Sequence, residues 1–232
     1  MKFLVLQHIN IEHPGIFLKF MKEDNIKIDT IELDDNEKIP NIDTYDAMIV
    51  MGGPMDTWQE ETYPWLKTEK ENIHNFVSIK KKPYLGLCLG AQLLGEAIGG
   101  KVRKMKIPEI GVLNVSVLNN KSIFKGLDKN LKALQWHSYE VCDLPSSANL
   151  LASSPECKVQ AFSSKNAFGL QFHVELTNET VPQWACVPEY KSALENTLGQ
   201  NALGKFKKDV EKNLNIFNKT AKIIYENFKK KI

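Results

Sequence analysis

The first half of the chain alternates short runs of β-forming residues with stretches of helical spacing, and this alternation limits the fold more than any other feature. The β-rich runs lie at residues 3–7, 26–33, 47–51 and 84–87. Helical spacing separates the first two runs and returns over residues 65–78, before Lys80-Lys81-Lys82-Pro83 ends it. Such alternation is typical of βαβ units. We therefore expect a mostly parallel sheet flanked by helices.

Beyond Gly99-Gly100 the pattern changes to shorter strands separated by turn residues. These predicted strands lie at 111–118, 133–136, 150–152, 159–162 and 169–172, and we expect them to extend the sheet in antiparallel fashion. From Thr180 the chain is predicted to be helical to its end, with apolar residues at spacings of three and four. We predict one α/β domain over residues 1–232, with a catalytic core at 1–178 and a C-terminal helical extension at 179–232.

Composition excludes several classes of partner. The 30 basic and 28 acidic residues leave a net charge of +2, and the basic surplus lies in the C-terminal segment rather than in a stripe interleaved with aromatic residues. We therefore expect no nucleic-acid partner. No apolar stretch is long enough to span a bilayer, and the first residues read as a strand rather than a signal peptide. The four cysteines have no metal-binding spacing, so we expect a reducing cytoplasm and no metal or cofactor.

The segment from Tyr84 to Gln92 places a cysteine where a buried strand runs directly into a helix. Its sequence, Tyr-Leu-Gly-Leu-Cys-Leu-Gly-Ala-Gln, gives Cys88 a glycine two residues away on each side. This is the pattern of a nucleophile elbow, whose sharp turn leaves no room for flanking side chains. The turn also sets the sulfur at a helix N-terminus, which favours the thiolate. A buried cysteine between glycines is the alternative for this motif alone.

A thiolate nucleophile needs a histidine that can act as a base and then as an acid toward the leaving nitrogen. In the sequence Phe-His-Val-Glu, His173 and Glu175 lie two residues apart at the end of a predicted strand. Residues two apart on a strand project to the same face, so Glu175 can orient the imidazole as the carboxylate does in a Ser-His-Asp triad. We predict a catalytic set of Cys88, His173 and Glu175.

A Gly-Gly-Pro turn, Gly52-Gly53-Pro54, follows the predicted strand at 47–51. Glycines let backbone N–H groups approach a ligand closely, and ligands of α/β sheets bind beyond the carboxyl ends of strands, where this turn and Cys88 both fall. Taken alone, the motif is better interpreted as an ordinary turn. Four further residues could line the same edge or serve packing alone: His8, Trp58, Tyr63 and Trp65.

Together these motifs resemble the three signatures of the class I, triad-type glutamine amidotransferases, in the right order. They are Gly52-Gly53-Pro54, Gly86-Leu87-Cys88-Leu89-Gly90-Ala91-Gln92 and His173-Val174-Glu175. The chain most resembles the stand-alone GMP synthase-like amidotransferases, to which the γ-glutamyl peptidases are related. Its sequence contains no P-loop, and we expect no second domain of acceptor-binding or ATP-binding size. The resemblance leaves the C-terminal helical segment unexplained, and Val174 stands where many members have proline.

The resemblance implies a flavodoxin-like α/β fold with Cys88 as nucleophile, His173 as base and acid, and Glu175 as its orienting carboxylate. It also implies an oxyanion hole made by the N–H groups of Gly53 and Leu89. The residues expected to bind substrate are Gly52, Gln92, His137, Ser138 and Tyr139. Gln92 would bind the amino-acid end of the substrate, and the last three lie where the family has another glutamine-binding strand. A purely structural role for His137 is equally compatible with the sequence.

The reaction that the resemblance implies is hydrolysis of a γ-glutamyl amide, either glutamine or a γ-glutamyl peptide, through a thioester on Cys88. Two alternatives stay open. The chain could be a glutaminase subunit that delivers ammonia to a separately encoded synthase, or a catalytically idle regulatory module. The intact set of Cys88, His173 and Glu175 argues against the idle module. The expected partner is a small-molecule substrate, with neither nucleic acid nor membrane involved.

Overall fold

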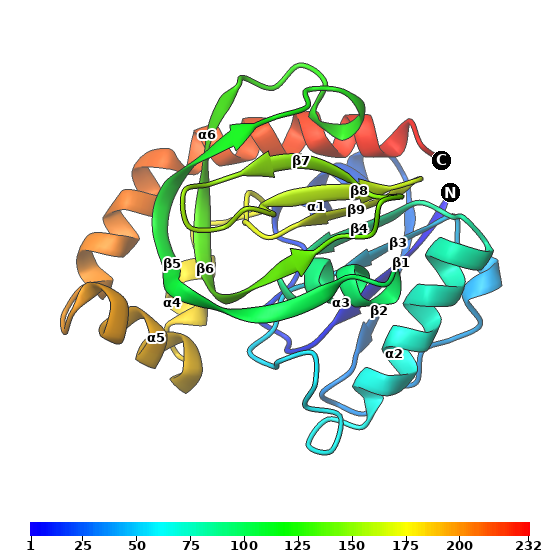
Figure 1. Ribbon diagram of the computed structural model, residues 1–232, viewed down its shortest axis with the longest axis horizontal. Coiled ribbons are helices and arrows are strands. Elements are labelled where there is room, and N and C mark those ends of the chain that lie inside the picture. The colour runs from blue at the N-terminus through cyan, green and yellow to red at the C-terminus, as the bar shows by residue number, and fades with distance from the viewer.

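The structure, a computed structural model, describes residues 1–232 and is built on one nine-stranded sheet (Figure 1). The strand order is β2-β1-β3-β4-β9-β8-β7-β5-β6. The strands are β1 (Lys2–Gln7), β2 (Lys27–Glu32), β3 (Ala47–Val50), β4 (Tyr84–Leu87), β5 (Lys101–Val117), β6 (Asn130–Asp143), β7 (Asn149–Ser153), β8 (Ala161–Ser164) and β9 (Ala167–Leu170). From β2 to β9 all neighbours are parallel, and from β9 to β6 all are antiparallel. The predicted parallel sheet with an antiparallel extension is confirmed.

The parallel strands are continuous apolar runs because helices cover both of their faces. Every residue of β3 and β4 is buried, and β1 is buried except for its first residue. β2 lies at the edge of the sheet and is only partly buried, in keeping with its alternating apolar and polar residues. The carboxyl ends of β1, β3 and β4 therefore meet at one edge of a rigid layer, which is where the predicted site residues begin.

The helices divide between the two faces of the sheet. Helices α1 (Ile16–Glu23) and α6 (Leu203–Lys229) pack on one face, and α2 (Trp65–His74) and α3 (Leu89–Ala97) on the other. Side chains alternate across a strand, so Phe3 and Val5 of β1 join the apolar cluster of α1 and α6. The intervening Leu4 and Leu6 join the cluster of α2 and α3. A π-helical turn at Asn75–Ile79 continues α2.

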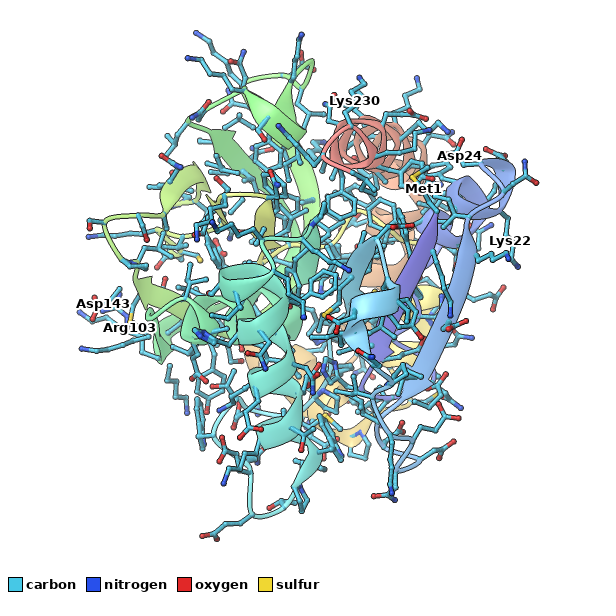
Figure 2. The ribbon with its side chains drawn as sticks, turned by 90° about the vertical axis from the view of Figure 1, so that its right-hand side faces the viewer. Met1, Lys22, Asp24, Arg103, Asp143 and Lys230 are labelled. Atoms are coloured by element: carbon cyan, nitrogen blue, oxygen red, sulfur yellow. The ribbon has the colours of Figure 1, made fainter.

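The C-terminal segment packs on the body of the protein, although it is not one continuous helix. It forms α4 (Thr180–Trp184), α5 (Pro188–Leu198) and α6, whereas the sequence predicted helix throughout. Pro188 begins α5, and Gly199, with φ 90°, ends it, which is the usual placement of these two residues at helix ends. Phe228 of α6 packs edge-on against Phe3 and Phe168 of the sheet. Figure 2 shows the end of α6 at Lys230 near Asp24 and Met1.

Two strand predictions were too short, and two were displaced. β5 and β6 are much longer than the predicted 111–118 and 133–136. The start of β5 was not predicted because it is largely exposed, rich in Lys and Arg, and lacks an apolar run. Arg103 and Asp143 mark this polar end in Figure 2. β8 and β9 were predicted at 159–162 and 169–172. They instead meet at a tight turn in which Lys165 has φ 55°.

No helix of the structure combines the length and the apolar character that crossing a membrane requires.

Candidate active site

The backbone around Cys88 has the elbow conformation expected from the sequence. β4 ends at Leu87, α3 begins at Leu89, and Cys88 between them has φ 51° and ψ −106°. A Cβ atom on Gly86 would lie 2.3 Å from the carbonyl oxygen of Gly90, and one on Gly90 would lie 2.2 Å from that of Val50. Side chains at these two positions would therefore force β4, α3 and β3 apart. The strained backbone presents the sulfur at the carboxyl edge of the parallel strands.

His173 and Glu175 form a buried pair next to this sulfur. The Nδ1 atom of His173 lies 2.6 Å from Oε1 of Glu175, and the Oε2 of Glu175 accepts a hydrogen bond from the backbone N–H of Val174 at 2.9 Å. The sequence placed His173 at the end of a strand, but β9 ends three residues earlier, at Leu170. An isolated antiparallel bridge to Leu134 of β6 positions His173 instead.

The electrostatic surroundings of His173 favour its protonated form. Burial lowers the pKa of His173, but the Glu175 carboxylate and the hydrogen bonds with Cys88 and Glu175 outweigh burial and raise this pKa well above its ordinary value. The indole ring of Trp184 packs edge-on against the imidazole, with ring centroids 4.7 Å apart. An imidazolium held against a cysteine sulfur can protonate a leaving group and, once neutral, can activate water.

The backbone of Glu175 is fixed by the segment that leads into α1. The N–H of Ile16 donates a hydrogen bond to the carbonyl oxygen of Glu175 at 2.7 Å. Gly15, with φ 52°, makes this approach possible, because a Cβ at that position would lie 1.8 Å from the same oxygen. Glu175 is therefore fixed at its carboxylate by His173 and Val174 and at its main-chain carbonyl oxygen by Ile16.

A buried histidine, His8, contacts the backbone of the Gly52-Gly53 turn. His8 places Nδ1 at 2.8 Å from the carbonyl oxygen of Gly52 and Nε2 at 3.0 Å from Oε1 of Glu69, and both side chains are fully buried. Burial lowers the pKa of His8, but the Glu69 carboxylate and the two hydrogen bonds raise it above its ordinary value. The sequence did not decide whether His8 lines the site or only packs in the core. It also did not indicate that Glu69 is a buried partner of His8, although Glu69 lies four residues from both Trp65 and Ile73, on the buried side of α2.

A cavity of about 230 Å³ opens above Cys88. Seven predicted site residues line it: Gly53, Cys88, Leu89, Gln92, His137, Ser138 and Tyr139. Gly52, His173 and Glu175 are not part of the lining. The remaining lining residues are Pro54, Met55, Asp56, Trp136, Glu189, Tyr190 and Ala193. The last three belong to α5, in the segment for which the sequence suggested no part in the site.

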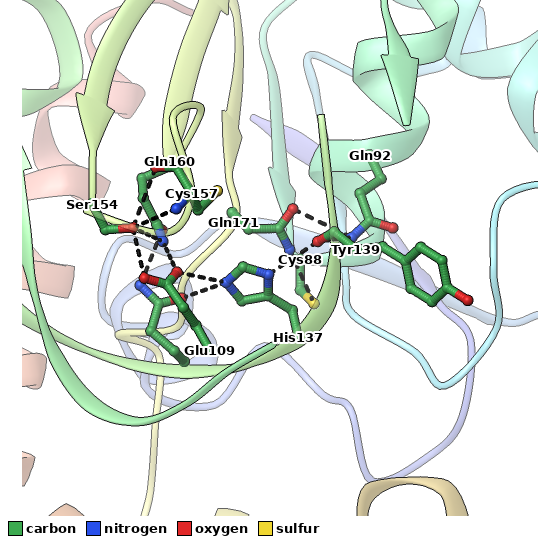
Figure 3. Close-up of polar contacts among 10 residues, drawn as sticks. Cys88, Gln92, Glu109, His137, Tyr139, Ser154, Cys157, Gln160 and Gln171 are labelled. Atoms are coloured by element: carbon green, nitrogen blue, oxygen red, sulfur yellow. Dashed lines mark hydrogen bonds and ion pairs between the residues drawn. The ribbon is translucent and has the colours of Figure 1, made fainter. Parts of the chain in front are cut away.

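Gln171, which sequence reasoning missed, contacts the sulfur directly (Figure 3). Its side-chain N–H donates a hydrogen bond to Sγ of Cys88 at 3.6 Å, and its oxygen accepts one from Gln92 at 3.3 Å. Gln92 also donates to the carbonyl oxygen of Tyr139 at 3.3 Å. The side-chain N–H groups of Gln92 are therefore engaged within the protein, whereas its oxygen has no hydrogen-bond partner there. A polar residue inside a predicted buried strand was the available signal for Gln171.

His137 is held by partners on both ring nitrogens. Nδ1 lies 3.0 Å from the carbonyl oxygen of Tyr139, and Nε2 lies 3.0 Å from Oε1 of Gln135 and 3.3 Å from Oε2 of Glu109 (Figure 3). Glu109 is itself buried and accepts hydrogen bonds from Ser154 and Gln160. These contacts join β5, β6 and the segment before β8 behind the cavity wall. The sequence contained no local signal for this network, because its members are brought together only by the antiparallel extension.

The aromatic residues after the Gly-Gly-Pro turn separate into two groups. Trp58 is about half exposed and packs edge-on against Tyr139 at the cavity, with ring centroids 4.9 Å apart. Trp65 instead stacks on His8 at 5.6 Å and also contacts Tyr63. Tyr63 and Trp65 therefore serve packing at the start of α2. No three His, Cys, Asp or Glu side chains lie close enough together to hold a metal ion.

Known proteins resemble this chain in both sequence and fold. The sequence profile of the family described as glutamine amidotransferase class-I matches residues 17–183. One component of the glutamine-hydrolysing GMP synthase of Sulfolobus acidocaldarius is 32% identical over 152 residues, which cover 64% of this chain and 77% of that protein. The corresponding component in Sulfurisphaera tokodaii is 36% identical over 134 residues, which cover 57% and 68%.

Two solved structures extend the similarity to the whole length. A glutamine amidotransferase of Thermotoga maritima superposes with a TM-score of 0.89 at 28% identity and covers 98% of this chain and 97% of its own. A glutamine amidotransferase of Methylobacillus flagellatus superposes with a TM-score of 0.88 at 23% identity and covers 100% and 95%. The second likeness concerns the fold alone. The fold similarity includes the C-terminal helices, beyond the part of the sequence that the family profile matches.

Proposed function

The chain belongs to the class-I glutamine amidotransferase family, and from this membership we propose that it hydrolyses γ-glutamyl amides through a thioester on Cys88. One observation carries the proposal. The buried His173–Glu175 pair, at 2.6 Å, lies beside the sulfur of an elbow whose cysteine has φ 51°. A nucleophile, a histidine that reaches it and a carboxylate that orients the histidine are the three parts of a covalent hydrolase.

In the acylation step, the thiolate of Cys88 attacks the side-chain carbonyl carbon of the γ-glutamyl group and forms a C–S bond. The carbonyl oxygen becomes an oxyanion, which the N–H groups of Gly53 and Leu89 stabilise. The imidazolium of His173 then gives its proton to the leaving nitrogen, the C–N bond breaks, and ammonia or an amine departs. The raised pKa of His173 supports this step, because the proton is already on the ring when the substrate arrives.

In the deacylation step, the neutral imidazole of His173 takes a proton from water as the water oxygen attacks the thioester. The C–S bond breaks, glutamate is released, and the proton on His173 restores the starting ion pair with Cys88. Glu175 keeps Nδ1 of the ring as the hydrogen-bond donor throughout, so that Nε2 faces the reaction. The net reaction consumes one water and yields glutamate and one amine.

A glutaminase subunit that supplies ammonia to a separate synthase is the second candidate. The names of the curated relatives favour it, since each is one component of a glutamine-hydrolysing GMP synthase. Both candidates require the same three residues. They differ in whether the chain turns over its substrate without another protein, so activity of the isolated chain decides between them.

We propose that the protein works in a reducing cytoplasm. All four cysteines are free, including the exposed Cys186 and the half-buried Cys142. Unpaired thiols persist in reducing compartments.

The test is glutamate release from glutamine and a panel of γ-glutamyl amides by the wild-type chain, Cys88→Ala and Cys88→Ser. Both variants should lose at least about 1,000-fold in kcat because they lack the nucleophile. Their circular dichroism should match that of the wild type because nothing else is changed. Cys142→Ser, a cysteine outside the cavity, is the matched control and should stay within about twofold. Near-wild-type turnover by either Cys88 variant would overturn the proposal.

A further inference from the structure

Helix α5 forms one wall of the cavity above Cys88, although it lies beyond residues 17–183, which the family profile matches. Glu189, Tyr190 and Ala193 line the cavity from this helix. The family signatures therefore account for the nucleophile and its partners but not for this wall. The wall is consequently a place where the chain can differ from its relatives in the substrates it accepts.

The wall lies on the side of Cys88 from which the leaving group departs. Trp184 of α4 packs against His173, and Tyr190 packs against Trp184 with ring centroids 6.0 Å apart. The group that protonates the leaving nitrogen must be within hydrogen-bonding reach of it. Since His173 does so in the proposed reaction, the released amine occupies the His173 side of the cavity, which Tyr190 borders.

A buried carboxyl group holds Tyr190 in this position. The Tyr190 hydroxyl donates a hydrogen bond to Oε1 of Glu12, a residue that is only 2% exposed. The other oxygen of Glu12 has no hydrogen-bond partner, and a Cβ on Gly52 would lie 2.6 Å from it. Glu12 therefore packs between α5 and the turn that carries the proposed oxyanion hole. Burial raises the pKa of Glu12, and His173 opposes this effect.

An incompletely satisfied buried carboxyl group is costly for stability. Such groups are found where function requires them more often than in ordinary cores. Here the carboxyl connects three parts of the site: Tyr190 through a hydrogen bond, Gly52 through direct packing, and His173 through its charge. A role in fixing the α5 wall relative to the reacting groups accounts for the two contacts and for the charge interaction with His173.

Two acidic residues, Asp56 and Glu189, belong to the cavity lining, and no lining residue is Lys or Arg. The charge of Lys104, outside the lining, acts on Asp56, whereas Glu189 is the charged residue of the α5 wall. Glu189 is the neighbour of Tyr190 on α5 and is exposed at the rim. Glu189, on the wall that borders the leaving amine, repels a leaving group with a free carboxylate, such as an amino acid. It does not repel ammonia, an amine without a further charged group, or an amine with a second, positively charged group.

Resting on the proposed γ-glutamyl hydrolysis, we propose that α5 forms the subsite for the leaving amine and selects uncharged or cationic amines over amino acids. Tyr190 is its specificity-determining residue, and Glu12 is the positioning residue that fixes the Tyr190 ring. Tyr190 limits the size of the amine, and Glu189 disfavours negative charge on it. The substrate class is therefore glutamine and γ-glutamyl amines rather than γ-glutamyl dipeptides.

The experiment compares kcat/KM on four γ-glutamyl substrates of the purified full chain. The ethylamide, the benzylamide, the 1,4-diaminobutane derivative and γ-glutamylalanine differ only in the amine. Wild type should prefer the ethylamide and the diamine derivative over γ-glutamylalanine by about tenfold or more, and Glu189→Gln should reduce this preference about threefold. Tyr190→Ala should raise the benzylamide relative to the ethylamide by about tenfold, chiefly through KM.

Further variants separate positioning from general packing. Glu12→Ala should raise kcat/KM for the benzylamide relative to the ethylamide, as Tyr190→Ala does. Glu12→Gln keeps an acceptor for the Tyr190 hydroxyl, so it should retain the wild-type ratio of these two values. Tyr225→Phe is the matched control, because Tyr225 of α6 also donates a hydrogen bond to a carboxylate, that of Asp24, away from the cavity. Tyr225→Phe should leave unchanged both the benzylamide-to-ethylamide ratio of kcat/KM and the preference over γ-glutamylalanine.

The outcomes distinguish this inference from the proposed function. If wild type releases glutamate but Tyr190→Ala leaves the ranking by size unchanged, the subsite assignment is wrong and the proposed function stands. A wild-type preference for γ-glutamylalanine would overturn the assignment of charge selection. Glutamine is assayed beside the four substrates: if wild type releases no glutamate from glutamine or from any of them, the proposed function fails and this inference fails with it.

Discussion

At the scale of single residues, the site depends on buried polar groups that hold one another in place. Cys88 is contacted by His173 and Gln171, His173 by Glu175, and the carbonyl oxygen of Glu175 by the backbone of Ile16. Each group therefore has its orientation set by a neighbour rather than by solvent. Such preorganisation is what proton transfer and oxyanion stabilisation require.

The two partners of Cys88 in the proposed triad should differ in how much activity they control. His173→Ala should be about as damaging as loss of the nucleophile, because it removes both the acid and the base. Glu175→Gln should retain about 10- to 100-fold more activity than His173→Ala, because Glu175 acts only through the ring. Steady-state kcat on glutamine measures this directly. If Glu175→Gln proved the worse variant, the assigned roles would be wrong.

The His8–Glu69 pair should make stability depend on pH. Burial lowers the pKa of His8, but Glu69 raises it more, so the folded pKa exceeds the unfolded value. The stabilisation is therefore complete below about pH 6.5, the ordinary imidazole pKa, and is lost as the pH rises through the higher folded value. Glu69→Gln should lower the free energy of unfolding by about 3 kcal/mol near pH 6 and by less at pH 9.

Urea denaturation at the two pH values tests this expectation. Glu60→Gln is the control, because Glu60 forms a partly exposed ion pair with Lys70 of α2. It should cost less than about 1 kcal/mol at either pH. An effect of Glu69→Gln that grows with pH would show that His8 is neutral in the folded protein.

At the scale of elements, the parts that could be predicted are those whose signals are local. The apolar runs of β3 and β4 and the glycines around Cys88 specify their structure within a few residues. β5 could not be delimited, because its exposed first half has the composition of a loop. The contacts of Glu12 with Tyr190 and of Gln171 with Cys88 join residues 178 and 83 positions apart in the chain. No local pattern indicates such pairs.

Helix α6 should contribute strongly to stability through its buried face. Phe217 is fully buried in the cluster that α6 shares with α1 and the sheet, whereas its neighbour Ile216 is 46% exposed. Phe217→Ala should lower the free energy of unfolding by about 3 to 5 kcal/mol through lost burial and a cavity. Ile216→Ala is the control on the same helical turn and should cost under about 1 kcal/mol. Equal effects would mean that α6 does not pack on the sheet as described.

At the scale of the whole molecule, the C-terminal helices belong both to the core and to the site. α6 covers the sheet face that α1 only partly covers, and α5 closes the cavity above Cys88. We therefore propose that residues 1–178 and 179–232 unfold as one cooperative unit. Coincident urea transitions measured by near-ultraviolet and far-ultraviolet circular dichroism would support this, and separated transitions would contradict it.

The central claim is that this chain, without another protein, forms a γ-glutamyl thioester on Cys88. The most direct measurement is rapid acid quenching of the purified chain during turnover of glutamine, followed by mass spectrometry of its peptides. We expect a glutamyl adduct on Cys88 alone, with none on Cys142, Cys157 or Cys186, and no adduct or glutamate release in Cys88→Ala. Glutamate release that persists in Cys88→Ala, or an adduct on another residue, would contradict the account.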